Sequence, residues 1–227
     1  MSIRSKARSA LDAIGLREPV LKFNARISCQ RTRRAFETSG FTKLHLGCGE
    51  NLLPGWFNTD LSPRANVAAL DVTRPFPFSS NSFDEIFTEH MIEHIAYTDA
   101  INVLKECYRV LQPGGKIRVS TPNLAFLVAL YEPKSELQER YIKWSSDHIS
   151  WARKPRSSFV INNFFRDWGH KFIFDEPALR DAFTEAGFVD IVSCPLGAFE
   201  NQSRMPEGFL QLETLTLEAR KPNYPET

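Results

Sequence analysis

The stretch LHLGCGE at residues 44–50 decides the fold, because an apolar, strand-forming run breaks there into two glycines one residue apart. Glycines spaced in this way let a backbone approach a ligand at positions where any side chain would occupy the ligand's space. A tight surface turn has the same local pattern. The neighbouring segments therefore decide whether the turn serves a nucleotide-like ligand.

Length and composition are those of one globular domain, since the chain has 227 residues of which 42% are hydrophobic and 24% charged. It contains no apolar run long enough to span a bilayer and no signal-peptide core, so we expect a cytoplasmic protein. The cysteines indicate neither a zinc ribbon nor a disulfide framework, because they are far apart in the sequence. They are Cys29, Cys48, Cys107 and Cys194.

Residues 1–34 form a basic segment, with nine Lys and Arg against Asp12 and Glu18, which gives a net charge of +7. Apolar residues recur at helical spacing between Ile3 and Ile14, so we expect residues 1–40 to be a basic helical arm before a domain at 41–227. Such an arm suits peripheral contact with an anionic membrane at its inner face. The alternative is a solvated helix packed on the domain's edge.

Three short apolar runs begin the domain, and an acid follows two of them. The first strand is predicted at residues 41–46, and the next two runs end at Asp60 and Asp71. Only the seven residues 50–56 separate Gly49 from Phe57, which is fewer than the dozen or so of a normal helical crossover. We therefore predict a single truncated turn of helix in this crossover.

The middle of the chain alternates between strand and helix patterns. Glu89 follows the fourth strand, so it joins Asp60 and Asp71 as an acid at a strand's carboxyl end. Alternation of this kind predicts a doubly wound, mainly parallel sheet with its ligand at those ends. The predicted elements are a strand at 83–87, a turn or short helix at 90–95, a helix capped by Thr98 or Asp99 and ended by the Pro-Gly-Gly of 113–115, and a strand at 116–120.

The last part of the chain opens with a long segment rich in aromatic and charged residues, at about 123–170. An insertion of this length in a compact domain is usually functional, so we interpret it as a partly helical lid. After it, Asp175 and Pro177 predict the start of a helix that Gly187 ends. Strands at 188–193 and 212–219 are predicted to complete the sheet.

The whole pattern resembles the class I S-adenosylmethionine-dependent methyltransferases, and within them the small type 11 group often found among glycan-synthesis proteins. The resemblance implies a Rossmann-like α/β fold with seven strands, the last antiparallel, shortened first crossovers and a helical, aromatic lid. The segments that carry it are LHLGCGE at 44–50, WFNTDL at 56–61, LDVTRPFPFSSNSFDEIFTEHMIEHI at 70–95, LKECYRVLQPGGKIRVSTPN at 104–123 and WGHKFIFDEPALRDAFTEAGF at 168–188.

The resemblance also implies roles in binding S-adenosylmethionine. Gly47, Cys48 and Gly49 would surround the methionine part of the cofactor, and Asp60 would accept hydrogen bonds from the ribose hydroxyls. The implied adenine contacts are Asp71 and Val72, and Glu89 would face the methionine end.

Two departures from the family pattern concern the first crossover. His45 stands where members commonly have an acid, which leaves the partner of the cofactor's ammonium group open. Asp60 also lies only 11 residues after Gly49, which is closer than in members with a full first helix.

The residues after the fourth strand indicate an oxygen acceptor, because they lack the Asn/Asp-Pro-Pro-Tyr type of motif that nucleic-acid amino methyltransferases use. We expect O-methylation of a sugar or glycan hydroxyl and no nucleic-acid partner, since aromatic side chains of the lid suit sugar rings. An oxygen acceptor needs a base. The main candidates are His94 and His170, and the further ones are Asp147 and His148.

Two other classes of function compete with this hypothesis. His90, Glu93 and His94 match the H-x-x-E-H motif of inverted zinc peptidases. Against a peptidase, the motif starts directly after a strand, and no downstream glutamate stands out as third ligand; we expect no metal. The other competitor is a methyltransferase-like scaffold that binds partners without catalysis.

Overall fold

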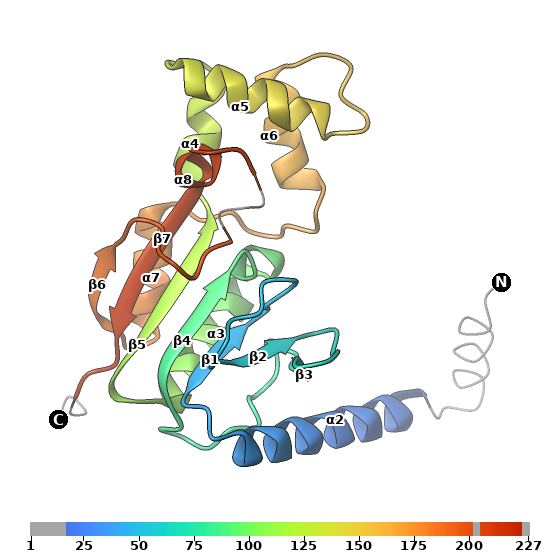
Figure 1. Cartoon of the computed structure of the whole chain (residues 1–227), viewed down its shortest axis with the longest axis vertical. Coiled ribbons are helices and arrows are strands. Elements are labelled where there is room, and N and C mark those ends of the chain that lie inside the picture. Colours follow the sequence, from blue (N-terminus) through green and yellow to red (C-terminus); the bar gives the residue numbers. More distant parts are fainter. Residues whose placement is uncertain (1–16, 202–204, 224–227) are drawn as a thin grey trace.

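A computed structural model describes residues 17–201 and 205–223, with side chains from residue 27 onward (Figure 1). Its centre is a seven-stranded sheet in the order β3-β2-β1-β4-β5-β7-β6. The first five strands pair in parallel, and β7 runs antiparallel to both neighbours, which confirms the predicted fold class. The strands are β1 Lys43–Leu46, β2 Phe57–Asp60, β3 Ala68–Ala69, β4 Phe83–Glu89, β5 Leu111–Pro122, β6 Val189–Ser193 and β7 Thr214–Arg220.

Helices lie at two opposite ends of the sheet, and others pack against the sheet itself (Figure 1). Helix α2 runs along one end, and the lid helices stand beyond the carboxyl ends of the parallel strands. The apolar residues expected to form a helix near residues 3–14 lie outside the described residues. The helices are α2 Arg17–Ser39, the 3₁₀-helix η1 Ile92–His94, α3 Tyr97–Val110, α4 Leu124–Ala129, α5 Glu136–Asp147, α6 Ser157–Arg166, α7 Glu176–Glu185 and α8 Phe209–Glu213.

Two of the three apolar clusters in the described part of the chain are large. The larger one joins the sheet to α3 and α7, with fully buried residues such as Leu104 and Phe183. The smaller one lies within the lid around Tyr141 and Phe164, which confirms that the aromatic insertion is a packed, partly helical unit. Phe36 of α2 contacts Phe57 and other rings of the larger cluster, so this helix is anchored to the sheet.

The crossover between β1 and β2 contains turns and no helical residue over the described segment 50–56, so the predicted turn of helix is wrong. The Asn58 side chain replaces it. Its Oδ1 accepts a hydrogen bond from Leu53 N (3.0 Å), and its Nδ2 donates to the carbonyls of Leu53 and Trp56 (3.1 Å each). The Asn58 side chain thus supplies hydrogen bonds to backbone groups that would pair with one another in a helical crossover.

Helix α3 begins two residues earlier than the sequence suggested. Ala96 is its extended N-cap residue and provides no side-chain hydrogen bond, so the caps predicted at Thr98 and Asp99 are wrong. Asp99 instead lies in the first turn, where a negative charge interacts favourably with the helix dipole. The cap predicted at Asp175 is confirmed, since its side chain accepts a hydrogen bond from Ala178 N (2.9 Å).

Two strand boundaries also differ from prediction. Strand β5 begins at Leu111 rather than Lys116, because Leu111 already pairs with Phe83 of β4 and Gly114 N donates to Lys221 O (3.0 Å). Strand β7 begins at Thr214 rather than Leu212, because α8 occupies the preceding residues and packs into the lid cluster. Backbone pairing thus sets where β5 begins, and the preceding helix sets where β7 begins.

None of the described helices combines the length and the apolar character that crossing a membrane requires.

Candidate active site

The glycine turn after β1 forms one wall of a pocket of about 440 Å³. Gly47 and Gly49 have φ values of +60° and +45°, in the left-handed region that glycine tolerates best. A Cβ on Gly47 would collide with the Met91 side chain, at 2.8 Å from its Cβ, whereas a Cβ on Gly49 would enter open space. Lining residues are Gly47, Gly49, Asp60, Leu61, Leu70, Asp71, Val72, Thr73, His90, Met91, His94, Ile95 and Lys171.

Asp60 links the end of β2 to the glycine turn. Its Oδ2 accepts a hydrogen bond from Gly49 N (3.1 Å), and its Oδ1 accepts one from Ser62 N (2.9 Å). A carboxylate has about four lone-pair positions, so two acceptor positions are left for a ligand in the same pocket. Asp60 is therefore placed to accept hydroxyl hydrogen bonds.

Asp71 and Val72 line the same pocket, but the Asp71 carboxylate is engaged by its own loop. It accepts hydrogen bonds from Thr73 N (3.1 Å), Thr73 Oγ1 (2.6 Å) and Arg74 Nε (3.0 Å). Burial alone would raise the pKa of Asp71, but the Thr73 and Arg74 hydrogen bonds lower it below the ordinary value. Asp71 therefore shapes the wall of the pocket as an ionised loop residue.

Cys48 and Glu89, which the resemblance places at the methionine end, do not line this pocket. The Cys48 side chain is buried, and burial raises the pKa of its thiol to about 11. Glu89 accepts hydrogen bonds from Asn51 Nδ2 (3.3 Å) and Asn201 N (3.0 Å). Its carboxylate thereby connects the first crossover to the segment that follows β6.

His45 also stays out of the pocket. Its ring is buried against Phe87, with ring centroids 5.1 Å apart, and its Nδ1 lies 3.0 Å from Asn58 Oδ1. Because that oxygen is an acceptor, Nδ1 carries the proton and donates it. The histidine that departs from the family pattern thus supports the first crossover rather than contacting the pocket.

A second pocket, of about 380 Å³, lies between the sheet and the lid. It shares His90 and His94 with the glycine-turn pocket, so the two pockets adjoin at these side chains. Aromatic residues of the lid region form much of its wall. The lining residues are His90, Glu93, His94, Pro122, Tyr141, Trp144, Phe164, Trp168, His170, Met205 and Glu213.

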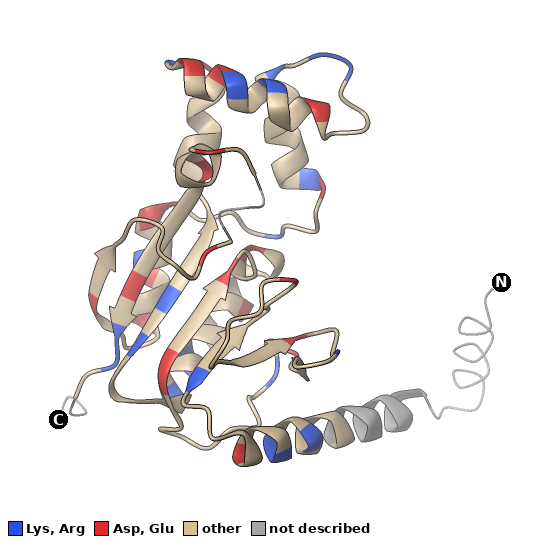
Figure 2. Ribbon diagram, viewed as in Figure 1, with Lys and Arg blue, Asp and Glu red and all other residues tan. Residues whose placement is uncertain are grey.

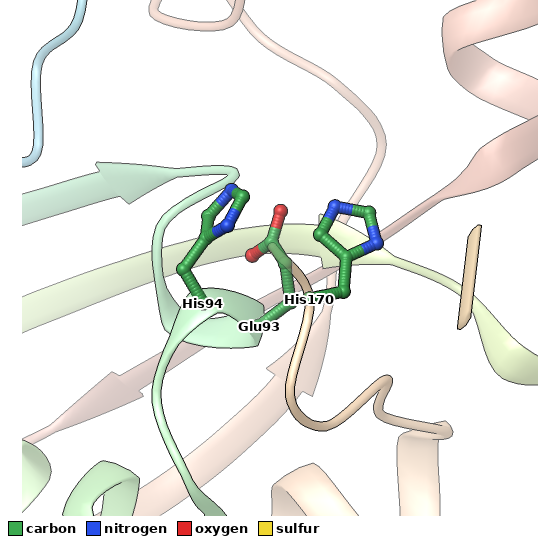
Figure 3. Close-up of side chains that lie close together, drawn as sticks. All are labelled: Glu93, His94 and His170. Atoms are coloured by element: carbon green, nitrogen blue, oxygen red, sulfur yellow. The ribbon is translucent and has the colours of Figure 1, made fainter. Parts of the chain in front are cut away.

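The structure brings the two main candidate bases together. His94 of η1 and His170, from the loop before α7, have ring centroids 4.9 Å apart. Figure 3 shows the Glu93 carboxylate between the two rings, and one ligand atom of each residue lies within 4.8 Å of the others. The further candidates Asp147 and His148 are exposed at the end of α5, outside the lining of either pocket.

Burial governs the charge of this cluster. It lowers the pKa of His170, whose Nδ1 donates to Phe164 O (2.8 Å), so the ring is neutral and Nε2 carries a lone pair. Burial opposes ionisation of Glu93, yet the nearby His90 ring lowers the pKa of Glu93 overall. Glu93 Oε2 also accepts a hydrogen bond from Thr121 Oγ1 (3.1 Å). The cluster thus combines a carboxylate with a neutral imidazole.

Sequence reasoning missed His90 and Met91 as pocket residues, and only their position directly after a strand could have indicated them. The peptidase alternative is not supported, because it needs His90 and His94 one helical turn apart. His90 instead precedes η1 with a φ of +49°, and its Nδ1 lies 3.3 Å from Glu93 Oε1.

Comparison with known proteins agrees with this architecture. Residues 44–119 match the family model described as a methyltransferase domain. The citrinin polyketide synthase CMeT domain superposes with a TM-score of 0.50 at 10% identity, over 81% of this chain and 47% of that one. A methyltransferase from Archaeoglobus fulgidus gives 0.48 at 16% identity, over 86% and 94%. No curated protein matches by sequence.

The CurJ carbon methyltransferase superposes with a TM-score of 0.48 at 15% identity, over 81% of this chain and 49% of that one. The chain thus spans about half the length of this protein and of the citrinin synthase domain. At these identities the likeness concerns the fold alone.

The sheet order, the glycine turn and the acid at the end of β2 are those of the Rossmann-like α/β fold class. The family model that matches residues 44–119 describes a methyltransferase domain, so this part of the chain is similar to that family, and the resemblance implies S-adenosylmethionine as the cofactor. The pocket can accommodate the cofactor that the resemblance implies, because a Cβ at Gly49 would meet open space and the Asp60 carboxylate has two acceptor positions left for a ligand.

Proposed function

We propose that this protein transfers a methyl group from S-adenosylmethionine to a hydroxyl oxygen of a sugar or glycan acceptor. The observation that carries the proposal is the junction of the two pockets at His90 and His94. A cofactor in the glycine-turn pocket and an acceptor under the lid would meet there. Alignment of the two reactants is the main requirement of a direct displacement.

The glycine-turn pocket provides the cofactor contacts of this proposal. Gly47 and Gly49 let the backbone approach the methionine part, Asp60 accepts hydrogen bonds from the ribose, and Val72 forms an apolar wall beside the adenine. When bound, the cofactor supplies an electrophilic methyl group on a sulfonium, so no covalent enzyme intermediate is needed. The chain's own task is to hold the acceptor oxygen in line.

The lid pocket has the character of a sugar site. Its volume lies in the range of small-molecule sites, and Trp144 and Trp168 offer partly accessible rings for the apolar faces of a sugar. Tyr141 donates a hydrogen bond to Glu213, which fixes the ring of one helix and the carboxylate of another in the same wall. Apolar faces and fixed polar groups suit a polyhydroxylated ligand.

His94 and His170 stand at the junction, where an acceptor hydroxyl would lie. A hydroxyl is a weak nucleophile until its proton is drawn away, and neutral imidazoles are the groups best suited to do so near neutral pH. Because burial keeps His170 neutral, the junction can activate an oxygen acceptor. Both histidines are thereby assigned to activation of the hydroxyl.

The test is mass-spectrometric detection of a product that carries one additional methyl group. The full chain and S-adenosylmethionine are incubated with sugar nucleotides, lipid-linked sugars and oligosaccharides, and with matched acceptors methylated in advance at single hydroxyls. We expect one acceptor class to gain a methyl group on oxygen. Methylation confined to amino or carbon positions would contradict the proposal.

Calorimetric measurement of cofactor binding compares the enzyme with the non-catalytic scaffold alternative. We expect Asp60→Asn to weaken S-adenosylmethionine binding by roughly tenfold, because a charge-assisted hydrogen bond is worth about 1.5 kcal/mol or more. Asp147→Asn, on the exposed end of α5, is the matched control and should bind normally. If the wild-type chain bound neither S-adenosylmethionine nor S-adenosylhomocysteine, the scaffold alternative would replace the enzyme.

A further inference from the structure

We propose that Glu93, His94 and His170 bind a divalent transition-metal ion where the two pockets meet. The ion's role in activating the acceptor hydroxyl rests on the proposed function, whereas its binding can be measured independently. The sequence predicted no metal, because no downstream glutamate stood out as a third ligand beside the H-x-x-E-H motif. Only the fold brings the three side chains together (Figure 3).

The donor set suits such an ion. Two imidazoles and one carboxylate are ligands that zinc and non-haem iron take in catalytic sites, where a position is left open for substrate. Bonds of about 2.1 Å in a tetrahedral site place ligand atoms roughly 3.4 Å apart. The present atoms lie within 4.8 Å of one another, so side-chain rotations that bring them closer by at most about 1.4 Å would close the site.

Outer hydrogen bonds already orient two of the three ligands, His170 and Glu93. His170 Nδ1 donates to Phe164 O (2.8 Å), which leaves Nε2 as the free donor atom. Glu93 Oε2 accepts from Thr121 Oγ1 (3.1 Å), so the carboxylate is held from behind. A carbonyl or hydroxyl partner behind each ligand is the usual support of a metal site.

The backbone fixes the distance between the two segments that carry the ligands. Lys171 N and Phe172 N both donate to Glu93 O, at 2.8 and 3.2 Å, so the residue after His170 is joined to η1. Gly169 adopts a φ of +78°, and a Cβ there would lie 3.7 Å from His94 Nδ1. The three ligands are therefore assembled by the protein itself.

The buried charge of Glu93 gives a reason for a cation here. Its side chain is fully buried, and Oε1 has no well-aligned hydrogen bond among the described residues, although His90 Nδ1 lies 3.3 Å away. A carboxylate removed from water needs a compensating charge nearby. A divalent ion between Glu93 and the two histidines would supply it.

Three protein ligands would leave open coordination positions toward the lid pocket that all three residues line. An acceptor hydroxyl that contacts the ion becomes more acidic, because the positive charge stabilises the alkoxide. Its O–H bond then breaks and the proton passes to water. In this arrangement His94 and His170 act on the hydroxyl through the ion rather than by accepting the proton themselves.

Metal binding is tested on the full chain after dialysis against a chelator and then against metal-free buffer. Titration with Zn²⁺ in a calorimeter and with Co²⁺ in a spectrophotometer should each show one equivalent bound, and Co²⁺ should develop visible absorption bands. His94→Gln and His170→Gln should each weaken Zn²⁺ binding by more than about 100-fold, since even outer partners are worth 10–100-fold. His148→Gln, an exposed histidine on α5, should bind normally.

Far-ultraviolet circular dichroism and a cooperative thermal transition that match the wild type show that each variant is folded. His94 and His170 are chosen before Glu93, because a substitution at the fully buried Glu93 is the one most expected to disturb folding. Absence of stoichiometric metal in the wild type would overturn the proposed site, as would equal loss of metal in His148→Gln. Sugar methylation that persists in protein without metal would overturn the ion's role and leave the proposed function intact. Metal binding without any sugar methylation would contradict the proposed function alone.

Discussion

His45 illustrates how burial sets the charge of a single side chain. Only 1% of the residue is exposed, and burial lowers its pKa to about 4 although the Asn58 hydrogen bond and the nearby Asp60 charge oppose that change. The neutral ring donates to Asn58 Oδ1 and packs against Phe87. Protonation would place an uncompensated cation next to the first crossover.

The stability of the protein should therefore fall as the pH is lowered toward 4. Between the ordinary pKa of 6.5 and the folded value of about 4, the unfolded chain takes up a proton at His45 that the folded chain does not. The resulting loss in free energy of unfolding is roughly 3 kcal/mol, at about 1.4 kcal/mol per pKa unit. This loss of stability is complete once the pH lies below the pKa of His45 in the folded protein.

The measurement is urea unfolding from about pH 7 to pH 4 for the wild type and His45→Asn. Asparagine keeps a donor for Asn58 but does not titrate in this range. The stability difference between the two proteins should shrink or reverse as the pH falls. A difference that is the same at every pH would show that His45 does not titrate in this way.

At the scale of an element, the first crossover depends on one amide. Asn58→Ala removes the partner of Leu53 N, Leu53 O, Trp56 O and His45 Nδ1 at once, in a position only 7% exposed. Unpaired buried polar groups cost about 1–3 kcal/mol each, so the loss of partner for these groups should lower the free energy of unfolding by about 4 kcal/mol or more.

Chemical denaturation of Asn58→Ala measures this loss. The matched control is Asn162→Ala, because Asn162 donates one hydrogen bond, to Ser158 O, at an exposed position on α6. The control should change stability by less than about 0.5 kcal/mol. Equal effects of the two substitutions would mean that Asn58 is not what holds the crossover.

At the scale of the whole molecule, basic residues lie at both ends, on α2 and on the lid. Arg31, Arg33 and Arg34 are exposed on α2, and Thr32 of the same helix is buried and donates to Ala69 O (2.6 Å). In Figure 2, blue segments of the ribbon mark further Lys and Arg positions on the lid at the opposite end. We propose that the α2 end contacts an anionic membrane surface, because the basic arm continues into this helix.

Sedimentation with vesicles of phosphatidylglycerol and phosphatidylcholine tests the contact. Arg31→Gln, Arg33→Gln and Arg34→Gln combined should weaken binding by at least roughly tenfold, since each basic residue near an anionic surface contributes about 1 kcal/mol. The control combines Arg153→Gln, Lys154→Gln and Arg156→Gln, which are exposed on the lid. If the lid substitutions weakened vesicle binding more, the membrane contact would lie at the lid, and the proposal for α2 would be wrong.

Local patterns were sufficient for most elements of the sheet, because apolar periodicity and glycines act over a few residues. The glycine turn, Asp60 at the end of β2 and the Asp175 cap could all be predicted in this way. Boundaries such as the start of α3 at Tyr97 could not, since backbone pairing and packing decide where an element begins.

The sequence by itself determined the order of strands and helices, the fold class and the glycine turn that lines the cofactor pocket. Only the tertiary structure decided that His45 is buried beside Asn58 and that Glu93, His94 and His170 meet. The reason is physical. Periodicity and turn chemistry are local properties of the chain, whereas a site built from η1 and a loop more than seventy residues later depends on backbone hydrogen bonds between them.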